Sequence, residues 1–157
     1  MNFKEKTVIV TGASEGVGAE VARLFALVGA NLVLVARTSK NLKKIAVELN
    51  NKTRVEIVAM DVSDADACAN LFSIAQAKFG AVHILINNAG CHYRGNVGST
   101  CPDDLMRMID VNLKAPILLS KHALPFIRKA GGGAIINVAS LAGRTPVPGA
   151  AVYSASK

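Results

Sequence analysis

The segment Thr7-Val8-Ile9-Val10-Thr11-Gly12-Ala13-Ser14-Glu15-Gly16-Val17-Gly18 decides the fold that this sequence predicts. Its first residues are mostly β-branched, which is typical of a buried strand. Thr11-Gly12 ends that strand, and an apolar pattern with helical spacing follows within a few residues. We therefore expect a strand, a glycine-rich loop and a helix in immediate succession.

The three glycines of this segment have distinct expected roles. Gly12 allows a tight turn, Gly16 removes a side chain where an anion must approach backbone amides, and Gly18 allows close packing of the helix on the sheet. The first turn of the helix offers free N–H groups and the positive end of its dipole. Plain turns contain glycines as well, so the loop needs support from other motifs. The residues expected to hold a dinucleotide pyrophosphate are Gly12, Ser14, Glu15, Gly16, Val17 and Gly18.

Strand-like and helix-like segments alternate along the whole chain. Further strands are expected at 32–35, 55–59, 84–86 and 134–138. Helices are expected at 17–28, 39–50, 64–79 and 102–129, with another beginning at 152. This alternation predicts an α/β fold, with a doubly wound parallel sheet of the Rossmann type between two helical layers. No linker divides the chain, so we expect one domain over residues 1–157.

Three helices carry more detailed expectations. On the first helix, the large apolar residues are expected to face the core, namely Val17, Val21, Leu24, Phe25 and Val28. The helix that ends near Phe79 is expected to be capped by Ser63 or Asp64. The stretch 102–129 is expected to form two helices, or one helix kinked near Pro116.

The residues after the second and third strands indicate which nucleotide would bind. Arg37 follows the second strand where an NAD enzyme would offer a carboxylate to the ribose 2′-hydroxyl, and its donor fork suits a 2′-phosphate. This favours NADP, with an exposed surface arginine as the alternative. Asp61 follows the third strand and is expected to accept a hydrogen bond from the adenine amino group, while Val62 contacts the ring edge. Helix capping is the alternative role for Asp61.

Tyr153, Lys157 and Ser140 form the expected reacting end. Tyr153 and Lys157 are four positions apart at the start of a predicted helix, so their side chains share one face. A nearby ammonium favours the ionised form of a phenol. The pair is therefore suited to exchange a proton with a substrate oxygen while hydride moves to or from the adjacent carbon. Ser140 follows the fifth strand and is placed to hold that oxygen.

Taken together, these motifs resemble the short-chain dehydrogenase/reductase family over the whole chain. The matching motifs are Thr11 to Gly18, Asp61-Val62, Asn87-Asn88-Ala89-Gly90, Asn112, Ser140 and Tyr153-Ser154-Ala155-Ser156-Lys157. The resemblance implies that Tyr153 is the general acid/base and that Ser140 polarises the substrate carbonyl. It also implies that Lys157 supports Tyr153 and binds the nicotinamide ribose.

The resemblance also assigns roles to Asn112 and to the four residues of the motif Asn87-Asn88-Ala89-Gly90. Asn88, Ala89 and Gly90 would line the adenosine ribose, and Asn87 would stabilise the sheet. The backbone carbonyl of Asn112 would hold a water in a proton relay, whereas the residues alone suggest only a polar position on a helix face. Glu15 departs from the pattern, because NADP-preferring relatives often carry Arg or Lys there.

The resemblance also implies elements beyond Lys157, where family members continue with the rest of the helix and two further strands. We therefore expect an N-terminal fragment of a longer protein, with the C-terminal strands missing and little or no catalysis by the 157-residue chain alone. The longer protein is expected to be a homo-oligomer, as relatives pair through long helices. The substrate is not defined by these residues beyond a small carbonyl or alcohol.

Composition and charge exclude several other classes. The formal charge is +7, but the basic residues are dispersed and aromatic residues make up only 4% of the chain, so no nucleic-acid site is expected. Cys68, Cys91 and Cys101 have no metal-ligand spacing, so no metal is expected, and their odd number without a secretory signal favours the cytoplasm. The longest apolar stretch, 24–36, is too short to cross a membrane.

Two functions of different classes remain open at this point. The first is an oxidoreductase, principally a reductase, that transfers hydride between NADP(H) and a carbonyl/alcohol pair, with an NAD-preferring enzyme as a variant of it. The second is a nucleotide-binding protein without turnover. The presence of Ser140, Tyr153 and Lys157 together favours the first.

Overall fold

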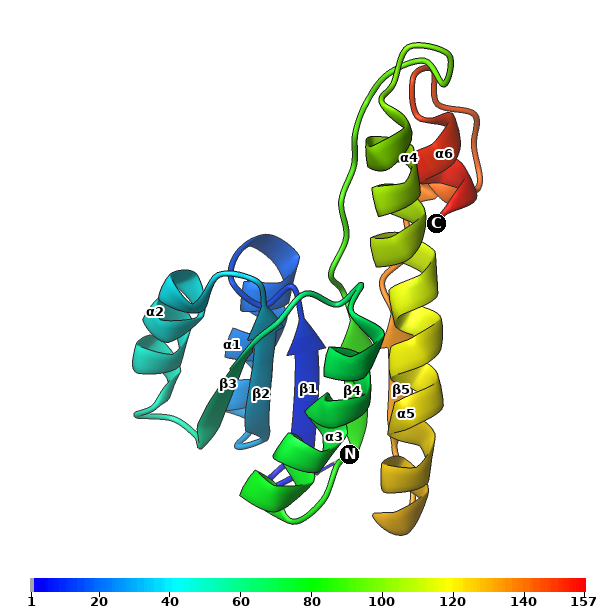
Figure 1. The fold of residues 1–157 in the computed structure, drawn as a ribbon. Coiled ribbons are helices and arrows are strands. Elements are labelled where there is room, and N and C mark those ends of the chain that lie inside the picture. Colours follow the sequence, from blue (N-terminus) through cyan, green and yellow to red (C-terminus); the bar gives the residue numbers. More distant parts are fainter. Residues whose placement is uncertain (1) are drawn as a thin grey trace.

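Five parallel strands form one sheet in the computed structural model, which describes residues 2–157. The strands are β1 (Thr7–Thr11), β2 (Asn31–Ala36), β3 (Val55–Ala59), β4 (Ile84–Asn87) and β5 (Ala134–Asn137). Their order in the sheet is β3-β2-β1-β4-β5 (Figure 1). The chain therefore winds outward from β1 to β3 and then crosses to the other side of β1. This confirms the doubly wound Rossmann-type sheet.

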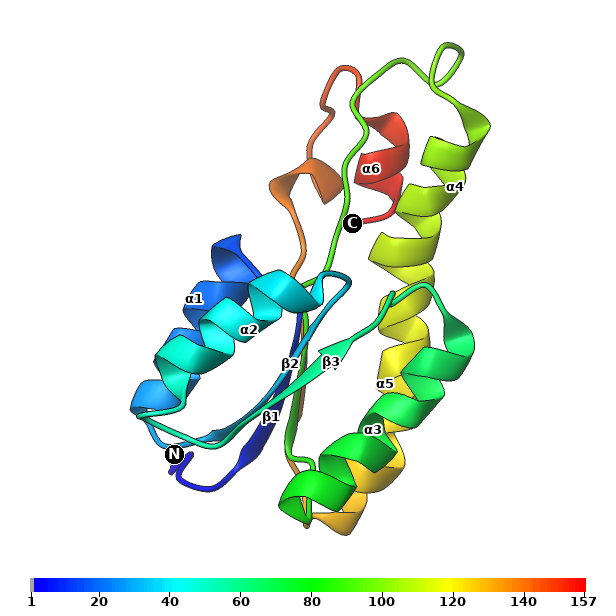
Figure 2. The same cartoon turned by 60° about the vertical axis from the view of Figure 1, so that its left-hand side comes forward.

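Helices cover both faces of the sheet, which gives the expected three layers (Figure 2). Helices α1 (Gly16–Leu27) and α2 (Ser39–Leu49) pack on one face, and α3 (Ala65–Phe79) and α5 (Ala115–Lys129) pack on the other. Helices α4 (Pro102–Ile109) and α6 (Ala151–Ala155) lie together beyond the carboxyl edge of the sheet (Figure 1). These two helices thus stand over the edge where ligands of open α/β sheets bind.

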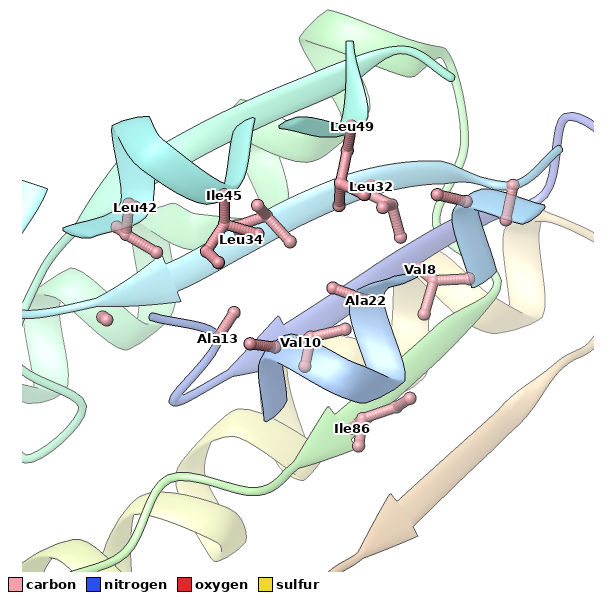
Figure 3. Close-up of a cluster of buried hydrophobic side chains, with 14 of the residues drawn as sticks. Val8, Val10, Ala13, Ala22, Leu32, Leu34, Leu42, Ile45, Leu49 and Ile86 are labelled. Carbon is pink, nitrogen blue, oxygen red and sulfur yellow. The ribbon is translucent and has the colours of Figure 1, made fainter. Parts of the chain in front are cut away.

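The core is divided by the sheet because successive side chains of each strand point to opposite faces. On the α1 and α2 side, Val8 and Val10 of β1 meet Leu32 and Leu34 of β2, as Figure 3 shows. On the other side, Ile9 belongs to a second buried cluster, which it forms with apolar residues of other strands and of the helices α3 and α5. Burial on both faces explains the continuous apolar runs of these strands.

The prediction of which α1 residues face the core is wrong for three residues. Val17, Leu24 and Val28 are exposed, while Val21 and Phe25 are only partly buried. The buried face consists of small residues instead, namely Gly18, Ala19, Ala22 and Ala26. Helix α1 lies so close to the sheet that only small side chains fit between them, so residue size decides this face more than hydrophobicity.

The other helix expectations are confirmed. Asp64 caps α3, because its side-chain oxygen accepts hydrogen bonds from the backbone N–H groups of Asp66 and Ala67. The stretch 102–129 is interrupted by a π-helical turn, Asp110–Lys114, which ends two positions before Pro116. Proline cannot donate to the carbonyl four residues earlier and its ring crowds that carbonyl, which accounts for the break at this place.

Candidate cofactor and active site

A cavity of about 270 Å³ opens at the carboxyl edge of the sheet. It is bounded by the loops that follow β1, β2, β3 and β4, which is the switch point of a doubly wound sheet. Most of the residues expected to bind a dinucleotide line it: Gly12, Ser14, Glu15, Arg37, Asp61, Val62, Asn88, Ala89 and Gly90. Four separate sequence motifs therefore meet at one hollow.

The glycine-rich loop is shaped by two close backbone approaches. Gly12 has a φ of +65°, which favours glycine, and a Cβ on Gly18 would overlap the Gly12 carbonyl oxygen. Gly16 and Val17 begin α1 rather than lining the cavity. Glu15 is the N-cap of α1 but makes no capping hydrogen bond through its side chain. The first N–H groups of this helix thus have no side-chain cap and suit an anion.

Thr11 joins the glycine-rich loop to the end of β4, a role that the sequence did not suggest. Its Oγ1 accepts hydrogen bonds from the backbone N–H groups of Asn88 and Ala89, each at 3.0 Å. The Asn88 Nδ2 in turn donates to the Thr11 carbonyl oxygen at 2.9 Å. The side chain of Asn88 therefore fixes the loop, while its position also borders the cavity.

Charged side chains of both signs line this cavity. Arg37, which is exposed, and Arg107 both contribute to its wall. Burial raises the pKa of the Cys91 thiol, and the nearby cations Arg107, Arg37 and Lys157 act in the opposite direction. Two carboxylates, Glu15 and Asp61, also line the cavity. The wall of the cavity thus offers both cationic hydrogen-bond donors and carboxylate acceptors to a ligand.

Asp61 is held by three hydrogen bonds. Its Oδ1 accepts from the Ser63 backbone N–H at 2.9 Å and from the Ser63 hydroxyl at 2.8 Å, and its Oδ2 accepts from Arg107 Nη2 at 2.6 Å. Burial alone would raise the pKa of Asp61, but the hydrogen bonds from Arg107 and Ser63 bring that pKa below its usual range. Asp61 does not cap α3, because Asp64 does.

Asn112 is buried in the π-helical turn and ties three elements together. Its Oδ1 accepts from the Cys91 backbone N–H at 2.9 Å, and its Nδ2 donates to the Cys91 carbonyl oxygen at 2.9 Å and to Ser156 Oγ at 3.0 Å. It is not an exposed polar position on a helix face. Pro116 also removes the usual N–H partner of the Asn112 carbonyl.

Lys157 lies close to the segments that follow β4 and β5. Its Nζ donates to the Val138 carbonyl oxygen at 3.3 Å, and a Cβ on Gly90 would come within 3.2 Å of it. Gly90 thus leaves the space into which the ammonium group fits. Lys157 and Asn112 also border a second cavity of about 530 Å³ between α5 and β5.

Tyr153 and Ser140 lie near the same end of the molecule but are not joined to each other by a hydrogen bond in residues 2–157. The Tyr153 ring stacks on His92, with ring centroids 4.1 Å apart and planes 23° apart. Ser140 Oγ accepts from the Ala142 backbone N–H at 3.2 Å. Tyr153 is half-buried and His92 is exposed. The sequence had given no signal for His92, because its partner is distant along the chain.

Between positions 2 and 157, no cluster of His, Cys, Asp and Glu side chains has the arrangement of a metal site. In the same part of the chain, every helix is too short or too polar to pass through a bilayer.

Comparison with known proteins defines the family. Residues 6–157 match the family described as short chain dehydrogenase. An uncharacterized oxidoreductase of Staphylococcus saprophyticus is 40% identical over 156 residues, and the meso-2,3-butanediol dehydrogenase of Serratia marcescens is 38% identical over 157 residues. The chain belongs to the short-chain dehydrogenase family.

Solved structures agree with this assignment. A metagenomic short-chain oxidoreductase, crystallised in complex with NADP, superposes with a TM-score of 0.94 at 38% sequence identity. The match covers 100% of this chain and 72% of that structure. Among the curated relatives, the chain covers 63% of the Staphylococcus protein and 62% of the Serratia protein.

Proposed function

We propose that the chain forms the NADP(H)-binding part of an oxidoreductase that transfers hydride between NADP(H) and a small carbonyl or alcohol substrate, principally as a reductase. One observation carries this proposal: the motifs after four different strands converge on a single cavity, which Arg37 and Asp61 line and beside which α1 begins. The NADP complex of a 38% identical relative supports the same cofactor class.

The residues at and beside the cavity offer separate partners for a pyrophosphate, a 2′-phosphate and an adenine. Free N–H groups at the start of α1 suit a pyrophosphate, and the absence of a Cβ at Gly12 and Gly18 allows the loop to stay close to the sheet. Arg37 would pair with a 2′-phosphate, and Asp61 would accept from the adenine amino group. Glu15 borders the same cavity, and its negative charge acts against the preference that Arg37 creates.

The reacting end supports proton transfer by this chain's own groups. When bound, the nicotinamide would accept or supply the hydride. The Tyr153 hydroxyl would exchange a proton with the substrate oxygen, which Ser140 would hold by a hydrogen bond. Lys157 would place its ammonium beside the nicotinamide ribose, in the space that Gly90 leaves open. The stack of His92 on Tyr153 limits the orientations of the phenol ring.

The Arg37→Ala variant tests the NADP assignment. Loss of a charged donor to the 2′-phosphate should weaken binding of NADPH by about tenfold or more, because such hydrogen bonds contribute about 1.5–3 kcal/mol. Binding of NADH should change by less than about twofold. The dissociation constants are measured by nicotinamide fluorescence, with Arg128→Ala, an exposed arginine on α5, as the matched control.

Three outcomes separate the candidate functions. Equal loss of NADPH and NADH binding in Arg37→Ala would contradict a role at the 2′-phosphate. Tighter binding of NADH than of NADPH by the unmodified chain would indicate an NAD-preferring protein. Binding without hydride transfer to any of a panel of carbonyls, even when the chain is extended, would indicate a nucleotide-binding protein without turnover.

A further inference from the structure

We propose that Arg107 is a positioning residue that makes the cavity selective for adenine, by holding the Asp61 carboxylate where it accepts from the 6-amino group of the base. This inference rests on the proposed function, because it assumes that a dinucleotide occupies the cavity. It assigns a role to a residue that belongs to none of the recognised motifs.

The contact between Arg107 and Asp61 joins segments 46 residues apart in sequence. Helix α4 stands over the carboxyl edge of the sheet (Figure 1), and the Arg107 side chain reaches from it to Asp61 in the loop that follows β3. Its two terminal nitrogens act as a fork. Nη2 donates to Asp61 Oδ2 at 2.6 Å, and Nη1 donates to Ser63 Oγ at 2.6 Å. A planar guanidinium makes both bonds at once and so fixes direction as well as distance.

The remaining bonds of Asp61 complete the restraint. Ser63 donates twice to Oδ1, once from its backbone N–H and once from its hydroxyl. Because Arg107 takes only one position on Oδ2, that oxygen retains acceptor capacity, and Asp61 borders the cavity. The carboxylate therefore cannot rotate freely, and its unused acceptor keeps a constant place.

A fixed carboxylate distinguishes bases by the group at position 6. Adenine presents an amino donor there, which a carboxylate accepts, whereas hypoxanthine presents a carbonyl acceptor, which a carboxylate repels. Arg107 and Asp61 both line the cavity, together with Met60 and Val62 of the same loop. The alternative is a purely structural brace between α4 and the β3–α3 loop, which would affect both bases equally.

The test compares two cofactors that differ only on this edge of the base, where hypoxanthine has a carbonyl in place of the 6-amino group and an N–H in place of the acceptor nitrogen N1. Dissociation constants are measured by fluorescence for NADPH and for reduced nicotinamide hypoxanthine dinucleotide phosphate. In Arg107→Ala, the preference for the adenine cofactor should fall at least about fivefold, since one charged hydrogen bond restrains the carboxylate. Arg128→Ala, an exposed arginine on α5, should keep the original preference.

Arg107→Lys supplies a second variant if Arg107→Ala does not fold, as judged by circular dichroism. Lysine keeps the charge but lacks the fork, so the preference should fall at least about twofold. An equal change in both dissociation constants, or no change, in the variant that folds would overturn the inference and leave the proposed function intact. If the unmodified chain bound neither cofactor, the proposed function would fail and this inference with it.

Discussion

At the scale of single residues, Gly18 approaches the backbone of the glycine-rich loop most closely, at the Gly12 carbonyl. A Cβ at this position would overlap the Gly12 carbonyl oxygen and press on the Asn88 side chain. The Asn88 side chain is held in place, because its Nδ2 donates to the carbonyl oxygens of both Thr11 and Gly12. The sequence anticipated this packing role, since the glycine stands at the start of a helix that follows a buried strand.

The Gly18→Ala variant should therefore lose stability. We expect the free energy of unfolding to fall by about 2 kcal/mol or more, because the overlap is with backbone atoms. Chemical denaturation measures the change. Gly98→Ala is the matched control, since a Cβ there meets nothing within 4 Å, and it should stay within about 0.5 kcal/mol of the unmodified chain. Similar stability of the two variants would contradict the close packing of α1.

Other residues of the site were beyond prediction from the sequence. Arg107 and His92 each contact a partner that lies far along the chain, and neither stands in a motif with a local pattern. Thr11 was predicted only as the end of a strand, although its hydroxyl connects two loops of the site. Local patterns define backbone shape and turn chemistry, whereas these contacts depend on how distant elements meet.

At the scale of secondary-structure elements, the size and the hydrophobicity of the side chains predict different buried faces for α1. Large apolar residues repeat at helical spacing, but the helix buries its glycine and alanine face. Strands β1, β2 and β4 were predicted more closely, because burial on both faces leaves a continuous apolar run with clear ends. The break before Pro116 was also predictable, whereas its π-helical form was not.

His83 connects the starts of β1 and β4 and makes this region sensitive to pH. Its Nδ1 accepts a hydrogen bond from the Thr7 backbone N–H at 3.1 Å, which requires an unprotonated nitrogen. Burial, together with the nearby charge of Lys6, lowers the pKa of His83. Protonation is therefore less favourable in the folded state than in the unfolded chain, whose histidines titrate near pH 6.5.

The resulting stability is present above about pH 6.5 and is lost as the pH falls through the lowered pKa of His83. We expect the free energy of unfolding to decrease between pH 7.5 and pH 5.5. The decrease should be smaller in His83→Asn, whose amide oxygen does not titrate. Urea denaturation at both pH values measures the difference. An equal decrease in the two proteins would show that His83 is not the responsible group.

At the scale of the whole molecule, the sheet places every proposed cofactor segment on one edge. Parallel strands bring the loops after β1, β2, β3 and β4 together, although these loops are spread over much of the sequence. This convergence was predictable, since it follows from the βαβ alternation alone. The positions of α4 and α6 above that edge were not, because they depend on the long loop after β4 and on contacts between the two helices (Figure 1).

Amide chemical shifts can show residue by residue whether NADP(H) binds at this edge of the sheet. The ¹⁵N-labelled chain is titrated with NADPH, and shifts are followed residue by residue. We predict saturable changes concentrated in four loops, at residues 12–17, 36–38, 60–62 and 88–91. Absence of saturable changes, or changes confined to the cavity between α5 and β5, would contradict binding of NADP(H) at the four loops.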